Sequence, residues 1–198
     1  MNILVVTAHP LENSLCTALT DHIISRLKGS GHTIVVEDLY GAQFDPVLSA
    51  QERKGYYADR YDATAVDSEV QRLENAEALV MVFPTWWFGF PAILKGWFDR
   101  VWVPGVAYDH ASDLGPIRPR LDSLRNAFVV TTLGATWWVD YFIMWRPVKR
   151  ILRFALLGAC ACNCRLRYLS FYKCETVNNE RIIRMKSRID SELGKLLD

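Results

Sequence analysis

Residues 78–102 read ALVMVFPTWWFGFPAILKGWFDRVW and carry the strongest structural signal in the chain. Leu79–Phe83 is a short, continuous apolar run, which is typical of a strand buried on both faces of a parallel sheet. Pro84–Gly89 forms the next loop, and Pro91 stands where a first helical turn tolerates proline. Apolar residues then recur at helical spacing from Leu94 onward, so the stretch predicts a strand, an aromatic loop and a helix.

The loop in this unit carries two neighbouring tryptophans, Trp86 and Trp87. Loops run over the protein surface, so bulky rings in a loop need a reason. One interpretation is that the rings cap the core or bury in a partner subunit. The other is that they form a wall for a flat aromatic ligand, because ligands of open parallel sheets bind beyond the carboxyl ends of the strands. Composition alone favours neither interpretation.

The same stretch resembles the flavin loop of the NAD(P)H:quinone oxidoreductase family. The shared pattern FPxxWFGxPAxLKGWFDRV spans residues 83–101 and is far more specific than a lone glycine motif. Residues 5–16, 38–49 and 131–134 resemble further segments of that family in the same order, so the resemblance covers about residues 1–135. It implies an α/β fold of the flavodoxin-like type, a three-layer sandwich around a five-stranded parallel sheet in the order 2-1-3-4-5.

The spacing of apolar residues agrees with alternating strands and helices. The expected strands are residues 2–7, 33–37, 79–83, 126–132 and 165–172. Helices are expected after a cap at Asn13 or Ser14, after a capping box at Ser49 and Glu52, after a second one at Thr64 and Asp67, over residues 142–157 and over residues 179–197. Right-handed crossovers between these strands are compatible with the strand order that the resemblance implies.

The resemblance also implies that the chain binds FAD and uses NAD(P)H as a co-substrate. The residues at the family's cofactor positions are His9, Ser14, Leu15, Cys16, Pro84, Thr85, Trp86, Trp87, Phe88, Thr131, Thr132, Leu133 and Gly134. FAD is favoured over FMN because the dense Ser/Thr loop of a small FMN-binding flavodoxin is absent. His9 could also be an ordinary loop residue and Ser14 only a helix cap.

The function that the resemblance implies is two-electron reduction of quinones or similar flat electrophiles by a ping-pong mechanism. The tyrosine and histidine that handle protons in the family are missing, since their places hold Val139 and a residue near Trp145. Tyr108 and His110 lie in the segment that resembles the family's pocket loop, so they are the candidate catalytic residues, although His110 could equally be a solvated loop histidine. The departures leave open another class, a flavin-binding regulatory subunit of a transporter or channel.

Length and charge limit the remaining possibilities. A chain of 198 residues suits one domain spanning residues 1–198. The net charge of +1 offers no electrostatic footprint for nucleic acid. No apolar run approaches the ~20 residues of a spanning helix, so no stable membrane insertion is expected. The basic, aromatic stretch Trp137–Leu157 could still touch a membrane surface, although it must also cover the sheet.

The five cysteines are an odd number without a recognisable signal peptide, which predicts free thiols and a cytoplasmic protein. Cys160, Cys162 and Cys164 do not have the spacing of a zinc site, so we expect no metal and interpret them as small buried hydrophobes. The loop aromatics and the long connection at residues 38–63 exceed what one small domain needs to cover itself. A homodimer is therefore expected.

Overall fold

A computed structural model describes residues 1–58, 61–111 and 115–197. For residues 196 and 197 it describes the backbone only. Its main sheet has five parallel strands in the order β2-β1-β3-β6-β7. These strands are β1 (Asn2–Thr7), β2 (Thr33–Asp38), β3 (Ala78–Pro84), β6 (Asn126–Thr132) and β7 (Arg165–Phe171). Counted as the main strands only, the order is 2-1-3-4-5, so the predicted flavodoxin-like topology is confirmed.

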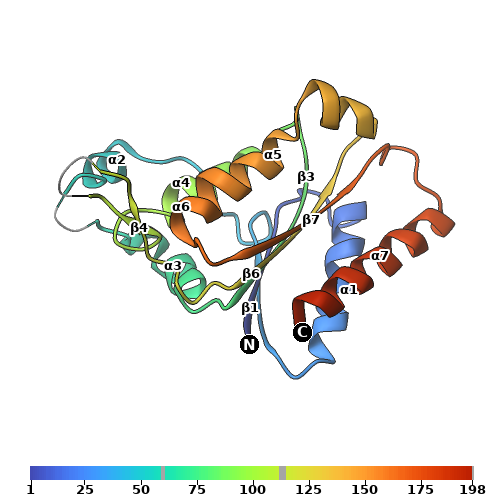
Figure 1. The fold of residues 1–198 in the computed structure, drawn as a ribbon, viewed down its shortest axis with the longest axis horizontal. Coiled ribbons are helices and arrows are strands. Elements are labelled where there is room, and N and C mark those ends of the chain that lie inside the picture. Colours follow the sequence, from blue (N-terminus) through green and yellow to red (C-terminus); the bar gives the residue numbers. More distant parts are fainter. Residues whose placement is uncertain (59–60, 112–114, 198) are drawn as a thin grey trace.

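Helices cover both faces of this sheet and complete three layers (Figure 1). The layer on one face holds α1 (Leu15–Lys28) and α7 (Asn179–Leu197), and the layer on the other holds α3 (Asp67–Glu74) and α4 (Ala92–Val101). β3 is buried along its whole length, as its continuous apolar run predicts. Leu79, Met81 and Phe83 face one core and Ala78, Val80 and Val82 face the other, because successive side chains of a strand point to opposite faces.

Two of the three predicted capping signals are confirmed. Ser14 caps α1 and accepts a hydrogen bond from the Thr17 N–H. Ser49 and Glu52 form a reciprocal capping box at the start of α2 (Ala50–Gly55). The box predicted at Thr64 is wrong: a short 3-10 turn, η1 (Thr64–Val66), precedes α3. The Thr64 N–H and hydroxyl instead donate to the nearby carboxylate of Asp62.

The single helix predicted for residues 142–157 is wrong as well. The chain forms a π-helical turn, η2 (Val139–Ile143), then bends sharply at Trp145 and Arg146, whose φ angles are 57° and 51°. A second helical segment follows, made of α5 (Pro147–Arg150), the π-helical η3 (Ile151–Leu157) and α6 (Gly158–Cys160). Pro147 explains the break, because it lacks an N–H and excludes the helical conformation from the residue before it.

Two features were not predicted at all. β4 (Tyr108–Asp109) and β5 (Arg118–Pro119) form a short antiparallel pair outside the main sheet. Cys162 is exposed, whereas Cys160 is buried and Cys164 is half-buried, so the expectation of three buried cysteines is wrong at the middle one. It lies in a turn between α6 and β7, where the chain has left the core.

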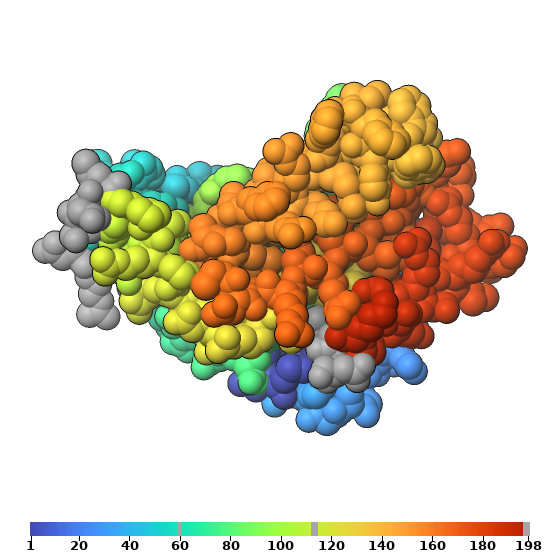
Figure 2. Space-filling model, viewed as in Figure 1, coloured from blue at the N-terminus to red at the C-terminus, as the bar shows by residue number. Residues whose placement is uncertain are grey.

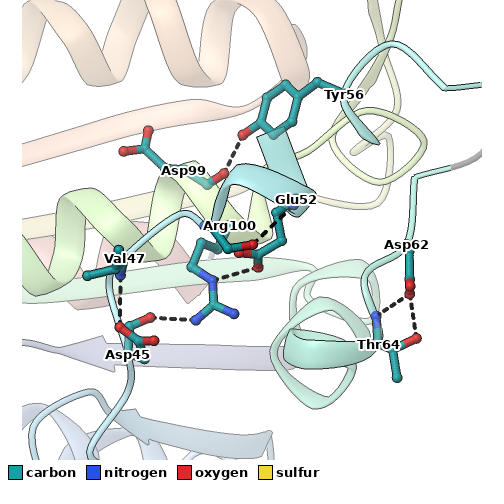
Figure 3. A network of polar contacts seen from close by, with 9 residues as sticks. Asp45, Val47, Glu52, Tyr56, Asp62, Thr64, Asp99 and Arg100 are labelled. Atoms are coloured by element: carbon teal, nitrogen blue, oxygen red, sulfur yellow. Dashed lines mark hydrogen bonds and ion pairs between the residues drawn. The ribbon is translucent and has the colours of Figure 1, made fainter. Parts of the chain in front are cut away.

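The long connection between β2 and α3 is fixed against α4. Gly96 permits the contact, because a Cβ added there would lie 2.2 Å from the carbonyl oxygen of Pro46. Arg100 of α4 donates to Glu52 Oε1 at 2.8 Å and to the Asp45 carbonyl at 2.6 Å, as Figure 3 shows. The Tyr56 hydroxyl donates to the Asp99 carbonyl. Residues 45–56 of the connection therefore pack against α4, and a nearly buried ion pair stabilises this contact.

Candidate functional site

The carboxyl edge of the sheet brings the three predicted cofactor segments together. The Thr85 N–H, after β3, donates to the Thr132 carbonyl, at the end of β6, over 2.8 Å. The Sγ of Cys16, in the first turn of α1, lies 3.2 Å from the Thr132 hydroxyl. The rings of His9 and Trp86 are 6.5 Å apart. Residues far apart in the sequence thus converge where parallel sheets bind ligands.

Trp86–Gly89 forms a two-residue hairpin closed by a hydrogen bond from the Gly89 N–H to the Trp86 carbonyl. Its central residues, Trp87 and Phe88, have φ angles of 50° and 57°. Positive φ at both central positions is the pattern of a type I′ turn, which normally selects glycine or asparagine. Trp87 is 99% exposed, so the hairpin holds a large ring in solvent on a strained backbone.

Donors in this hairpin are left without protein partners. Within the part of the chain that the structure describes, the buried Thr85 hydroxyl has no hydrogen-bond partner. The N–H groups of Trp87 and Phe88 likewise donate no hydrogen bond to another described residue. An unpaired buried hydroxyl costs about 1–3 kcal/mol, so an orphan of this kind needs an explanation. A flat ligand with a polar edge, as a flavin has, would fit both the orphaned donors and the exposed ring.

The β1–α1 loop presents a helix start to the same edge. Nδ1 of His9 accepts a hydrogen bond from the Leu11 N–H at 3.1 Å, and no other described residue bonds to Nε2 of His9, which is therefore available to a ligand. Ser14 acts as the N-cap of α1, with its hydroxyl 2.8 Å from that of Thr17. Helix-start N–H groups and the helix dipole both favour an anion at such a place. The loop could therefore hold a phosphate group.

Several predicted cofactor residues direct their side chains into the core. Burial raises the pKa of the Cys16 thiol to about 11, so it is neutral and bonds only inside the fold. Thr131 bonds to Tyr168 and Ser170, each at 3.3 Å. Leu133 is buried, and Leu15 packs against the core from the edge. These residues, together with Pro84 and Thr132, have mainly their backbone to offer a ligand.

Gly134 is exposed and lies against an acid. A Cβ added at Gly134 would come within 2.6 Å of a carboxylate oxygen of Glu175. That oxygen is the far end of a flexible side chain, so a small movement of Glu175 would relieve the contact. The Cys174 N–H, one residue before Glu175, donates to the Leu133 carbonyl at 2.9 Å. This backbone hydrogen bond fixes the position of the second cofactor loop.

A polar network behind this loop was missed by sequence reasoning. The Tyr172 hydroxyl donates to the buried Asp140 carboxylate at 2.7 Å, and the guanidinium of Arg146 lies 3.8 Å from that carboxylate. Burial and Asp140 raise the pKa of Tyr172, so the phenol keeps its proton. Tyr172 directly follows β7, the last strand of the main sheet. Residues that directly follow parallel strands often belong to a ligand site, and this position could have identified Tyr172 from the sequence. It supplies a phenol near the place where the family's tyrosine is missing.

Tyr108 and His110 lie elsewhere. Nε2 of His110 is 3.0 Å from the Tyr56 carbonyl, and its ring stacks on Tyr57 at 5.1 Å and meets Tyr108 edge-on at 5.4 Å. Burial raises the pKa of the Tyr108 phenol. β4 and α2 lie at one end of the long axis, away from the carboxyl end of β3 (Figure 1). Among the residues that the structure describes, no hydrogen bond, ion pair or ring contact joins this cluster to the hairpin of the same chain.

A cavity of about 600 Å³ lies beside the carboxyl end of β7. Phe171, Met185 and Trp137 line its apolar part, and Arg181, Arg184 and Arg188 of α7 line its rim. The guanidinium of Arg188 lies 5.5 Å from the centre of the Phe171 ring, with no carboxylate partner in the described chain. Such a cavity suits an aromatic group that carries negative charge.

Two kinds of site have no counterpart in residues 1–58, 61–111 and 115–197. No three His, Cys, Asp or Glu side chains converge there as metal ligands would. No helix in those residues has the length and apolar character to cross a membrane. All five cysteines are free thiols.

Comparison with known proteins gives concordant matches. A family model described as the flavodoxin-like fold matches residues 1–186. NAD(P)H dehydrogenase (quinone) 1 of Cavia porcellus is 34% identical over 150 residues, which cover 67% of this chain and 53% of that protein. The chain thus spans about half the length of the curated relatives it matches.

Two solved structures superpose over almost the whole chain. The NAD(P)H:quinone oxidoreductase of Methanothermobacter marburgensis has a TM-score of 0.81 at 27% identity, with 95% of this chain and 92% of that chain covered. An FMN-dependent NADH-azoreductase of Bacillus anthracis, solved with FMN, has a TM-score of 0.78 at 15% identity, with 100% and 99% covered. At 15% identity, the second match supports only the shared fold.

Proposed function

Because this chain belongs to the family of proteins with the flavodoxin-like fold, we propose that it is a flavin-dependent NAD(P)H oxidoreductase that reduces quinones or similar flat electrophiles. The observation that carries this proposal is the strained aromatic hairpin at residues 86–89, which Thr85 joins to the end of β6. A flavin held there would supply hydride transfer from NAD(P)H to the acceptor. The names of the relatives from Cavia porcellus and Methanothermobacter marburgensis support the same reaction.

The chain's own groups would bind and orient the cofactor. The Thr85 hydroxyl and the N–H groups of Trp87 and Phe88 are the donors available for its polar edge. The rings of Trp86 and Trp87 would exclude water from one side of the site. Tyr172, kept protonated by burial and Asp140, would hold a proton behind the second loop. Positioning of this kind is the protein's share in cofactor catalysis.

FAD is the flavin that we propose. The cavity of about 600 Å³ beside β7 would take the adenosine half, with its ring on Phe171 and Met185 and its phosphates toward the cationic rim. FMN is the competing outcome, because the distant azoreductase structure contains FMN. Mass analysis of the cofactor released from denatured protein decides between them. Arg188→Glu should weaken FAD binding at least tenfold and leave FMN binding unchanged, since only FAD would reach that rim.

We also propose that the enzyme acts as a homodimer. Tyr108 and His110 can serve the flavin only if a second copy brings its hairpin toward them, since β4 lies away from the hairpin of its own chain. A cavity of about 820 Å³ beside His110 leaves room at that end of the molecule. Light scattering at micromolar concentration tests this, and a monomeric mass would refute it.

The proposed activity is tested with purified protein loaded with flavin. We expect oxidation of NADH or NADPH that depends on a simple water-soluble quinone, with parallel double-reciprocal plots as in ping-pong kinetics. Thr85→Val is the informative variant, because it removes the orphaned hydroxyl and keeps the side-chain shape. It should weaken flavin binding about tenfold without destabilising the apoprotein. Flavin-loaded protein that shows no turnover with any quinone would overturn the proposal.

A further inference from the structure

Two thiols converge on the end of β6. The Sγ of Cys16, in the first turn of α1, is 3.2 Å from the Thr132 hydroxyl. The N–H of Cys174, in the loop between β7 and α7, donates to the carbonyl of Leu133, the next residue along β6, at 2.9 Å. Cys16 belongs to the apolar core between the sheet and α1 and α7, and Cys174 packs against that core. The two cysteines therefore meet on one face of the sheet, although they come from opposite ends of the sequence.

The charge state of one thiol affects the other. Burial is the largest cause of the raised pKa of Cys16, and the Thr132 hydroxyl opposes it. Negative charge on Cys174 raises this pKa further, which requires the two side chains to be neighbours because charge interactions weaken with distance. Cys160 and Cys164 lie in or against the core on the opposite face, where burial alone raises the pKa of each. Cys16 and Cys174 are thus the two thiols from distant segments that the fold brings together.

The two thiols differ in their access to solvent. Cys16 is only 2% exposed, whereas Cys174 is half-buried in a loop whose neighbouring residues are exposed. In Figure 2 the red-orange atoms that follow β7 form the surface at the right of the view, and blue atoms appear only along its lower edge. Burial raises the pKa of the Cys174 thiol, but the Leu133 N–H and the positive charge of Arg181 oppose burial and favour the thiolate. Cys174 is therefore the thiol that an oxidant reaches, and Cys16 lies behind it.

We propose that Cys16 and Cys174 form a site of reversible oxidation, which hydrogen peroxide closes to a disulfide and which thereby controls flavin binding. The Cys174 thiolate attacks one oxygen of the peroxide, the O–O bond breaks, and Cys174 becomes a sulfenic acid as hydroxide leaves. The Cys16 thiol then attacks the sulfenic sulfur, so that the S–S bond forms and the hydroxyl group leaves with the Cys16 proton as water. Hydroxide takes up the proton that Cys174 lost. Two thiols are thus oxidised and one peroxide is reduced to two molecules of water.

The regulatory part of this proposal rests on the proposed function. Ser14 caps the first turn of α1, where a phosphate group could bind, and the β7–α7 loop carries Lys173, which lines the cavity proposed for the adenosine half. A disulfide holds its two Cβ atoms about 3.5–4.5 Å apart, so it would fix the start of α1 against this loop. The two parts of the flavin site could then no longer adjust to the cofactor. We expect oxidised protein to bind FAD about tenfold more weakly, which corresponds to the loss of one charge-assisted hydrogen bond.

Peptide mapping of the full chain tests the site directly. Trypsin places Cys16 and Cys174 in the separate peptides 1–26 and 174–181, and it leaves the other three cysteines together in peptide 154–165. After treatment of the flavin-free protein with hydrogen peroxide and alkylation of the remaining thiols, we expect peptides 1–26 and 174–181 to be joined by a disulfide. Dithiothreitol should separate the two peptides and restore the FAD affinity, which quenching of flavin fluorescence measures. The disulfide should form faster as pH rises, because the thiolate is the attacking species.

The matched control is Cys162→Ser, which removes the exposed thiol and should leave the cross-link unchanged. Cys16→Ser should abolish the cross-link and leave Cys174 as a sulfenic acid that dimedone traps, whereas Cys174→Ser should abolish both products.

Three outcomes would overturn the proposal. Oxidation confined to peptide 154–165, or a cross-link that joins two chains on a non-reducing gel, would show that Cys16 and Cys174 do not form the site. Equal FAD affinity of the cross-linked and the reduced protein would remove its regulatory role. The mapping needs neither flavin nor turnover, so its failure is distinguishable from failure of the proposed function.

Discussion

The hairpin strain permits a test in which stability and ligand binding move in opposite directions. Trp87 has a φ of 50° and is 99% exposed, so its ring contributes almost no burial to the free protein. A left-handed residue costs about 1–2 kcal/mol, and asparagine tolerates that conformation better than tryptophan. Trp87→Asn should therefore stabilise the apoprotein by about 0.5–1 kcal/mol. Urea unfolding of flavin-free protein measures this change.

The same substitution should weaken flavin binding, because an aromatic contact contributes about 0.5–1.5 kcal/mol beyond area burial, or roughly 2- to 10-fold in Kd. Quenching of flavin fluorescence gives the Kd. Gln43→Asn is the matched control: Gln43 has a φ of 52° and is exposed, but among the described residues no hydrogen bond or ring contact joins it to the hairpin. It should stabilise the chain without changing the Kd. A Trp87→Asn protein with native flavin affinity would refute the assignment of the hairpin as a ligand wall.

Four further predictions test the scaffold and the proton step. Arg100→Met leaves Glu52 buried without its partner and should cost about 3–5 kcal/mol in urea unfolding, more than Arg100→Met/Glu52→Gln costs. Burial of Glu52 would raise its pKa, but hydrogen bonds from Ser49 and Arg100 outweigh burial and lower it. The contribution of Glu52 to the free energy of unfolding is therefore complete above its ordinary pKa of 4.5 and is lost as the pH falls through the lowered pKa. Glu52→Gln should reduce this loss of stability at acid pH. Gly96→Ala drives a methyl into the Pro46 carbonyl and should cost about 1–3 kcal/mol, whereas Gly194→Ala, in open space on α7, should cost nothing. His110→Phe should slow flavin reoxidation by quinone about 10²-fold or more in stopped flow and leave reduction by NAD(P)H unchanged. A variant that is reoxidised as fast as the native protein would return His110 to the role of a loop residue.

The sheet could be predicted because its signals are local. β3 is an unbroken apolar run, and a fully buried strand needs nothing else. Ser14 and the Ser49–Glu52 pair are likewise short-range signals, and both caps form as expected. The prediction of one helix over residues 142–157 was wrong because the apolar periodicity continues across Pro147, whereas a helical backbone cannot continue through a proline. At this position the proline is a stronger signal for a helix end than the periodicity is for a continuous helix.

The site could be predicted only in part, because its side chains act through contacts that spacing does not encode. The sequence identified the loops that meet at Thr85 and Thr132, but not that Cys16 and Thr131 direct their side chains inward. It also missed Tyr172, whose pairing with Asp140 joins residues 32 positions apart. The grouping of Tyr108 with His110 was visible in the sequence, but their distance from the hairpin depends on where β4 packs.

Backbone strain gives an independent indication of where this molecule binds its ligand. All six non-glycine residues with positive φ among the described residues follow the carboxyl ends of main-sheet strands; they are Gln43, Trp87, Phe88, Trp145, Arg146 and Lys173. At the opposite edge, the turn between α1 and β2 uses a glycine, Gly31, for the same conformation at a φ of 73°. In the connecting turn between α1 and β2, glycine adopts the left-handed conformation without strain. In the loops at the carboxyl edge, residues with large side chains adopt the same conformation and the backbone is strained. Selection for stability alone would have placed glycine or asparagine at both edges. The strained residues therefore mark the carboxyl edge as the functional edge, by an argument that uses no relative of the chain.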